Sequence, residues 1–118
     1  MLYRMSRESL GEFEQFVLLA ILRLTAAGTD EIYGVPIVDE IEQRTGRKVT
    51  RAAVYIALRR LEYKGFVATW MGAPTQERGG KSRRCVKVTR TGMQALRESK
   101  QAAEQMWQGL DPRLEKIR

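Results

Sequence analysis

The sequence predicts an α+β fold that is mainly α-helical, with a small β-hairpin set between three helices and one final long helix. Three observations lead to this fold class. Four stretches place apolar residues at helical spacing, two short segments rich in aromatic and β-branched residues flank a polar loop, and 118 residues suffice for one domain. With 43% hydrophobic and 30% charged residues, the chain can bury a core of its own.

The first helix is expected to begin at Ser9. Ser9 and Glu12 fit a capping box, in which the hydroxyl and the carboxylate each satisfy a backbone amide. Apolar residues then surround the helix almost completely between Phe16 and Leu24. Because one small domain does not cover a helix on every side, Phe16 and Leu19 are expected to contact a second subunit.

Two further helices follow. The turn Tyr33-Gly34-Val35-Pro36 precedes the second helix, which Gly46 should end. The third helix has Thr50 as its N-cap and Gly65 as its stop. Its inward stripe is Val54, Ala57, Leu58 and Leu61, and its opposite face carries Ala52, Tyr55, Ile56, Arg59 and Tyr63. A face that mixes small, aromatic and cationic groups is suited to contact another molecule.

Two strands are predicted over Phe66–Met71 and Arg84–Arg90. In the second strand Val86 and Val88 share one side, and Cys85, Lys87 and Thr89 share the other. The intervening loop 72–83 is polar, basic and too long for a tight hairpin turn. It is a candidate for a projecting, cationic wing.

The last helix is expected to start at Thr91, which forms a second capping box with Gln94, and to stop before Pro112. A helix placed after the sheet has little of its own domain to pack on, so its apolar stripe is expected to pair with a second copy. The residues expected in this homodimer contact are Phe16, Leu19, Met93, Leu96, Ala103, Met106, Trp107 and Leu110. Residues 9–90 then form the main domain, 91–110 a dimerisation helix and 111–118 a tail.

Charge is distributed unevenly along the chain, whose formal net charge is +7. The segment from Arg44 to Arg90 holds thirteen Lys and Arg residues against two acids, and the rest holds eight basic residues against twelve acidic ones. One part of the molecule is therefore suited to a polyanion. A merely solvated basic surface is the alternative interpretation.

Several function classes are disfavoured. Histidine is absent, which removes the commonest general base and the commonest nitrogen ligand for metals. Cys85 has no histidine to activate it, and Gly79-Gly80-Lys81-Ser82 lacks the spacing of a phosphate-binding loop. No enzyme activity, cofactor or metal is predicted. The apolar run 16–22 is too short to cross a membrane and residues 1–9 lack a secretory signal, so the protein is expected in the cytoplasm.

The order of elements suits a winged helix-turn-helix domain, in which the second helix of the motif enters the major groove of double-stranded DNA by its N-terminal residues. Arg51 can fork onto a guanine, and Thr50, Tyr55 and Arg59 have donors suited to phosphate. The predicted DNA-binding residues are Thr50, Arg51, Ala52, Tyr55, Arg59, Lys81, Arg83 and Arg84. The alternatives are a Tyr55 ring that packs the helix on the wing, a solvated Arg51 and a mobile, charged loop tip.

These residues also carry a family resemblance. The dipeptide Tyr33-Gly34, the run from Thr50 to Gly65, the run from Gly79 to Arg84 and Val88-Thr-Arg-Thr-Gly92 resemble the PadR family of regulators over about Leu18 to Leu96. The resemblance implies a homodimer held by its first and last helices, a recognition helix at Thr50–Lys64 and repression of nearby genes. Cys85 and Val86 depart from it, since the family often has tyrosines there.

Two further hypotheses remain open. Some relatives bind planar aromatic molecules at the dimer interface, and the resemblance extends this to a small aromatic effector at Trp107, which otherwise only packs the interface. The domain could also be a winged-helix module that binds an acidic protein or RNA without reading DNA sequence. The exposed face with Arg51 and Arg59 favours a DNA major groove, because the deep groove of A-form RNA excludes side chains.

Overall fold

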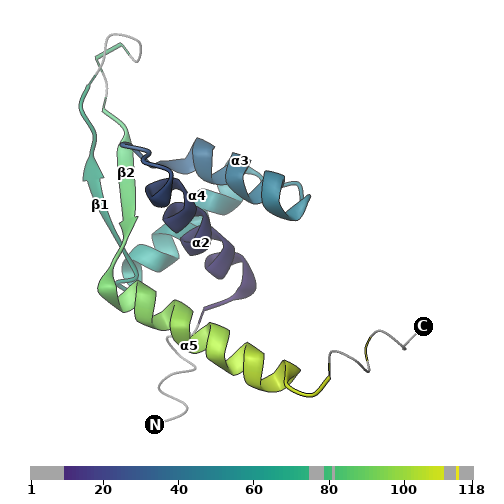
Figure 1. Cartoon of the computed structure of the whole chain (residues 1–118). Helices are drawn as coiled ribbons and strands as arrows, with labels where there is room; N and C mark the ends of the chain where they lie inside the picture. Colours follow the sequence, from purple (N-terminus) through teal and green to yellow (C-terminus); the bar gives the residue numbers. More distant parts are fainter. Residues whose placement is uncertain (1–9, 75–78, 81, 111–113, 115–118) are drawn as a thin grey trace.

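Three helices pack around one apolar core, a hairpin projects beside them, and a long helix runs beneath (Figure 1). The structure is a computed structural model that describes residues 10–74, 79–80, 82–110 and 114. Its elements are α2 (Glu12–Ala26), α3 (Gly34–Thr45), α4 (Arg51–Tyr63), β1 (Val67–Met71), β2 (Arg84–Val88) and α5 (Arg90–Trp107). The predicted fold class and order of elements are confirmed.

Helix α2 begins later than the sequence predicts. Its N-cap is Gly11, whose amide donates to the Oε1 of Glu14 over 2.9 Å. The carboxylate of Glu12 accepts instead from Arg47. The prediction of a start at Ser9 capped through Glu12 is therefore wrong, because a residue distant in sequence takes the Glu12 side chain. Ser9 lies outside the described residues.

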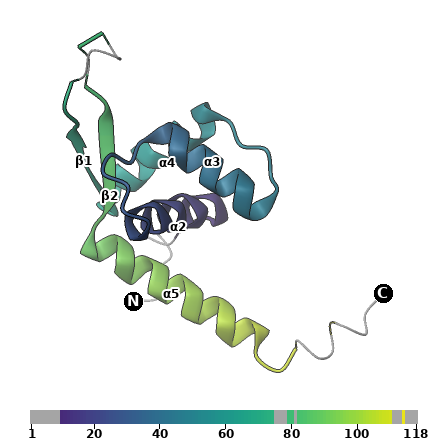
Figure 2. The same cartoon turned by 45° about the horizontal axis from the view of Figure 1, so that its top comes forward.

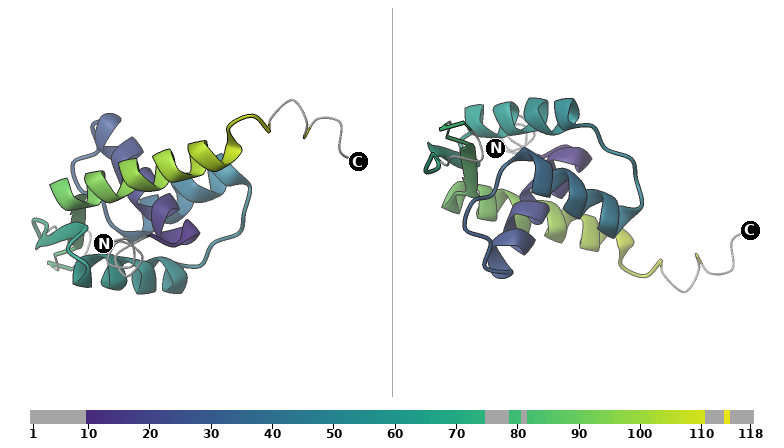
Figure 3. Two further views of the ribbon diagram at one scale, coloured as in Figure 1. Left: turned by 90° about the horizontal axis from the view of Figure 1, so that it is seen from below. Right: turned by 90° about the horizontal axis from the view of Figure 1, so that it is seen from above.

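The core lies where α2, α3 and α4 meet. Its fully buried side chains include Val17, Leu18 and Ile21 of α2, Ile37 of α3 and Leu61 of α4. Seen from above and below, α4 and α5 lie on opposite sides of the molecule with α2 between them (Figure 3). Helix α2 therefore packs between the two outer helices, α4 and α5.

The turn between α3 and α4 is fixed by local hydrogen bonds. Gly46 ends α3 in the left-handed region, at φ +74°, as expected. The carboxylate of Glu42 accepts from the amide of Val49 over 2.8 Å, and the Thr50 hydroxyl accepts from the amide of Ala53 over 3.0 Å. Thr50 is the N-cap of α4, as the sequence predicts.

Strands β1 and β2 form an antiparallel hairpin in which Val67 pairs with Val88 and Met71 pairs with Arg84. The prediction that the second strand extends to Arg90 is wrong, because Arg90 is the first residue of α5. Cys85 is fully buried although it lies on the face opposite Val86. A Cβ on Gly72 would lie 3.0 Å from its Sγ, so the wing backbone covers the sulfur.

The N-cap of α5 is Thr89, not Thr91. The Thr89 hydroxyl accepts from the amide of Gly92 over 3.0 Å and donates to the carbonyl of Gly65 over 2.7 Å. The amide of Thr89 donates to the carbonyl of Phe66. The predicted capping box with Gln94 is wrong by two residues, because the end of α4 provides Thr89 with a partner. None of the helices described combines the length and hydropathy that a bilayer crossing requires.

Helix α5 lies partly on its own domain, which differs from the expectation. Leu96 is 8% exposed and belongs to the core beside α2, whereas every residue from Lys100 to Leu110 is exposed. The helix slants away beneath the other three (Figure 2). Its first half is therefore fixed within one chain, and its second half is uncovered.

Candidate nucleic-acid interface

The outward face of α4 carries the residues that the sequence assigns to contact. Val54, Ala57 and Leu61 are at most 4% exposed on the inner side. The opposite side exposes Ala52, Tyr55, Ile56, Arg59 and Tyr63. No acidic residue occurs between Thr50 and Leu61. This face is cationic and apolar, with no charge that would repel a polyanion.

The first turn of α4 presents Thr50 and Arg51. The Thr50 oxygen caps the helix, and its hydroxyl proton can still donate to an outside acceptor. Arg51 is exposed, and it makes no ion pair within the described part of the chain. A cation at a helix N-terminus gains nothing from the helix dipole, so this guanidinium contributes little to folding.

Tyr55 packs on the start of α3. A Cβ on Gly34 would lie 2.9 Å from the ring and from the hydroxyl oxygen of Tyr55. The ring is 49% exposed, so one face contacts α3 and the other is available. The absent side chain of Gly34 leaves room for this ring on α3, and packing of Tyr55 against the wing stays a prediction.

The base of the wing is tied to the helices. The guanidinium of Arg83 lies over the ring of Tyr33, 4.1 Å from its centroid. The Nη2 of Arg84 lies 3.1 Å from the Oε2 of Glu62, whose carboxylate also accepts from Thr69 over 2.9 Å. The hydrogen bond from Thr69 first, and then Arg84, lower the pKa of Glu62. Tyr33 and Glu62 thus hold Arg83 and Arg84 in place, which argues against a mobile, charged loop at these two residues. Lys81 lies outside the described residues.

Other basic residues of this segment form internal ion pairs. Arg47 pairs with Glu12 over 3.0 Å and lies 5.2 Å from the centroid of the Phe16 ring. The hydrogen bond from Arg47 lowers the pKa of Glu12. Two further pairs among the described residues are Lys64 with Glu14, over 2.9 Å, and Arg44 with Glu40, over 3.2 Å. The sequence could show only the Arg44 pair, because its partner is four residues away on one helix.

Seven cations of the same segment make no ion pair in the part of the chain that the structure describes. Lys48, Arg51, Arg59 and Arg60 lie on or beside α4. Lys87 lies in β2, Arg90 begins α5, and Arg83 stacks on Tyr33. The positive charge available to a ligand is therefore concentrated on α4. The sequence does not show that Arg47, Lys64 and Arg84 are paired, because their partners come from distant positions.

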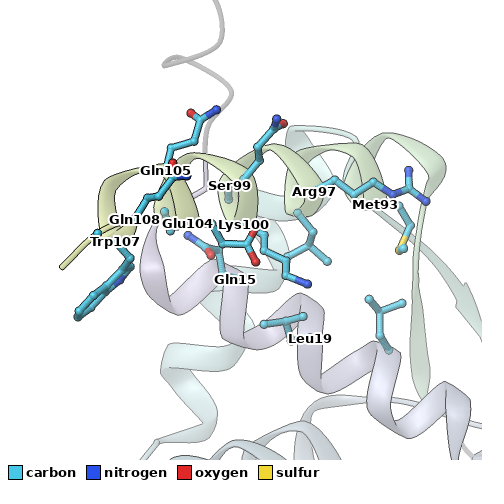
Figure 4. Close-up of a pocket in the computed structure, with 15 residues that line it drawn as sticks. Gln15, Leu19, Met93, Arg97, Ser99, Lys100, Glu104, Gln105, Trp107 and Gln108 are labelled. Carbon is cyan, nitrogen blue, oxygen red and sulfur yellow. The ribbon is translucent and has the colours of Figure 1, made fainter. Parts of the chain in front are cut away.

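A groove of about 1500 Å³ lies between α2 and α5, on the other side of the molecule from α4. Leu19 on α2 faces α5, Met93 projects from α5 toward α2, and Trp107 projects from the end of α5 (Figure 4). Leu19 is 44% exposed and Trp107 is 53% exposed. The groove brings Leu19, Met93, Leu96, Ala103 and Trp107 of the expected dimer contact together.

The other residues expected in the dimer contact do not line this groove. Met106 is 78% exposed on α5, and Leu110 is 39% exposed just beyond that helix. Phe16 is half-buried, packs against the core and lies beneath Arg47.

Comparison with known proteins agrees with the resemblance. The family model for the transcriptional regulator PadR-like family matches residues 21–98. No curated protein sequence shows significant similarity to the chain.

Solved structures of PadR-type regulators are similar to this fold. A PadR family transcription regulator from Clostridium difficile aligns with a TM-score of 0.68 and 18% identity, over 88% of this chain and 99% of the other. A PadR-like transcriptional regulator from Bacillus cereus gives 0.66 and 20%, over 90% and 93%. A PadR family transcriptional regulator from Eggerthella lenta gives 0.65 and 24%, over 87% and 84%. The fold is a winged helix, and the chain belongs to the PadR-like family of transcriptional regulators.

Proposed function

We propose that this protein is a repressor that binds specific sequences of double-stranded DNA as a homodimer in the cytoplasm. Residues 9–90 form the DNA-binding domain and residues 91–110 the dimerisation helix. The observation that carries the proposal is the outward face of α4, which is exposed and has no acidic residue between Thr50 and Leu61. The cations that border it make no ion pair with any residue that the structure describes. A helix of this kind fits the major groove.

Each residue of the interface has a chemical role in this proposal. Arg51 forks onto the two acceptors of a guanine, and Ala52 lets the helix approach the bases closely. Thr50, Tyr55 and Arg59 donate to phosphates. On the wing, Lys81, Arg83 and Arg84 contact the minor groove or the backbone. The stacking of Arg83 on Tyr33 and the pairing of Arg84 with Glu62 support a fixed wing base, since both cations are oriented before DNA arrives.

Binding is tested by fluorescence anisotropy with DNA duplexes, in the presence of competitor DNA and at several salt concentrations. We expect affinity to fall steeply with salt, because each neutralised phosphate releases counterions. Replacing Arg51 by Ala should abolish the preference for one base. Arg23→Ala is the matched control, because Arg23 is an exposed arginine at the far end of α2. Equal binding to all duplexes and to RNA would favour the alternative of a module without sequence preference.

A homodimer is supported by the groove between α2 and α5 and by the uncovered second half of α5. A second copy would cover Leu19, Ala103 and Trp107 there. Two neighbouring alanines provide a matched test: Ala103 lines the groove and Ala102 does not. Ala103→Glu should give monomers in sedimentation at micromolar concentration, and Ala102→Glu should leave the dimer intact. A wild-type monomer under these conditions would contradict the proposed architecture.

A small aromatic effector is the finer part of this proposal. Trp107 lines the groove and is 53% exposed, so two symmetry-related indoles could form flat walls for a planar molecule. Titrating planar aromatic compounds should change Trp107 emission and operator affinity together. The Trp70→Phe background removes the other tryptophan. If neither quantity changes across the panel, Trp107 serves packing alone.

A further inference from the structure

We infer that Ile56 determines sequence specificity by contacting the methyl group of a thymine. The inference rests on the proposed function, because it requires α4 in the major groove. Ile56 is 52% exposed on the outward face of α4, one turn after Ala52 and one turn before Arg59 and Arg60. An aliphatic group thus stands between cations on the surface that would face the bases.

Folding alone does not explain an isoleucine at this position. More than half of its surface is exposed, and the core stripe of Val54, Ala57 and Leu61 lies on the other side of the helix. β-Branched side chains lose rotamer freedom in helices, so alanine or arginine at position 56 would stabilise helix α4 more than isoleucine does. A partner that covers the side chain would recover the cost of exposing it to water.

The chemistry of the surrounding surface selects nucleic acid as that partner. Ala52 is small and allows close approach, while Arg51, Arg59 and Arg60 border the site with positive charge and the α4 face has no acid before Glu62. Within the major groove, thymine alone presents a methyl group, at C5. An aliphatic side chain surrounded by cations therefore fits the major-groove edge of a thymine, because the cations can contact the phosphates of the two DNA strands on either side.

The test exchanges thymine for uracil, which lacks only this methyl group. Binding duplexes are first selected from a random pool with the wild-type protein, and each thymine of the selected site is then replaced by deoxyuridine. We expect one position in each half-site at which uracil weakens binding about fourfold, the value for one buried methyl-sized group. Replacement in both half-sites should weaken binding about 16-fold, because the two factors multiply.

Ile56→Ala should bind thymine and uracil duplexes equally. Tyr63→Ala is the matched control, because Tyr63 lies on the same face of α4 and is 94% exposed. This variant should retain the uracil effect. An uracil effect of equal size in wild type and Ile56→Ala, or no sensitive thymine, would overturn the inference and leave the proposed function standing. Selection of no sequence at all would overturn both.

Discussion

The ion pair between Glu14 and Lys64 makes a quantitative prediction about stability. Glu14 is 8% exposed, and its carboxylate lies 2.9 and 3.2 Å from the Nζ of Lys64. It also accepts from the amide of Gly11. The pair joins the first turn of α2 to the C-cap residue of α4. Glu14→Gln keeps the size and the acceptor for Gly11, and it removes the charge.

Removing one charge of a fully buried pair costs about 3–5 kcal/mol. The Lys64 side chain is 23% exposed and can reach water, so we expect Glu14→Gln to cost about 2–3 kcal/mol. Lys64→Met leaves a carboxylate that is 10% exposed, and we expect a cost of about 3 kcal/mol. The double variant leaves no charge to solvate, so it should lose only about 1 kcal/mol relative to wild type.

Thermal unfolding followed by circular dichroism measures these costs. For a chain of this size, 1 kcal/mol corresponds to about 4 °C, so Glu14→Gln should lower Tm by about 8–12 °C. All variants must be compared at one protomer concentration, because association contributes to the apparent stability. Additive losses in the double variant, or a loss below about 1 kcal/mol in Glu14→Gln, would refute the reasoning.

Three further predictions concern the interface and the wing. Gly34→Ala places a Cβ 2.9 Å from the Tyr55 ring, so the ring must move. Fluorescence anisotropy should therefore show weaker DNA binding by this variant. In a Tyr55→Ala background, Gly34→Ala should cause no further loss of DNA binding. Because hydrogen bonds from the hairpin lower the pKa of Glu62, its contribution to stability is present above its ordinary value of 4.5 and is lost as the pH falls through the lower folded value. Urea unfolding of Glu62→Gln should therefore show a flatter decline in stability below about pH 4.5 than wild type does. Arg51→Ala should weaken the cognate site by about 1–3 kcal/mol, whereas Arg83→Ala should weaken all duplexes and reduce the salt slope by about one. Identical effects of the two changes on every duplex would remove Arg51 from base reading.

Local signals in the sequence predicted the elements well, and tertiary partners decided the remaining details. Thr50 caps α4 as predicted, because its acceptor function needs only an amide three residues away. The two N-caps that were predicted wrongly each lie two residues from the true one: Gly11 caps α2 instead of Ser9, and Thr89 caps α5 instead of Thr91. Arg47 takes Glu12 and leaves the capping role to Glu14, and the carbonyl of Gly65 fixes Thr89 in place of Thr91.

In the candidate site, too, some residues were predictable from local sequence patterns, whereas their contacts depend on the tertiary fold. The exposed face of α4 follows from helical periodicity, so its members were predictable. The partners of Arg83 and Arg84 are Tyr33 and Glu62, which are 50 and 22 positions away along the chain. Leu96 fits the same apolar stripe as Trp107, but only the position of α2 shows that Leu96 is a core residue. No pattern within one helix contains that information.

The start of α5 fixes the direction in which this helix leaves the end of α4. The hydroxyl of Thr89 bonds both Gly65, at the end of α4, and Gly92, and a Cβ on Gly92 would collide with the carbonyl oxygen of Phe66. Helices α4 and α5 therefore leave this point at one fixed angle. In a dimer paired through α5, that angle and the length of the helix determine how far apart the two copies of α4 lie. Such a dimer would bind half-sites at the one spacing that this angle sets and would bind the same half-sites more weakly at other spacings.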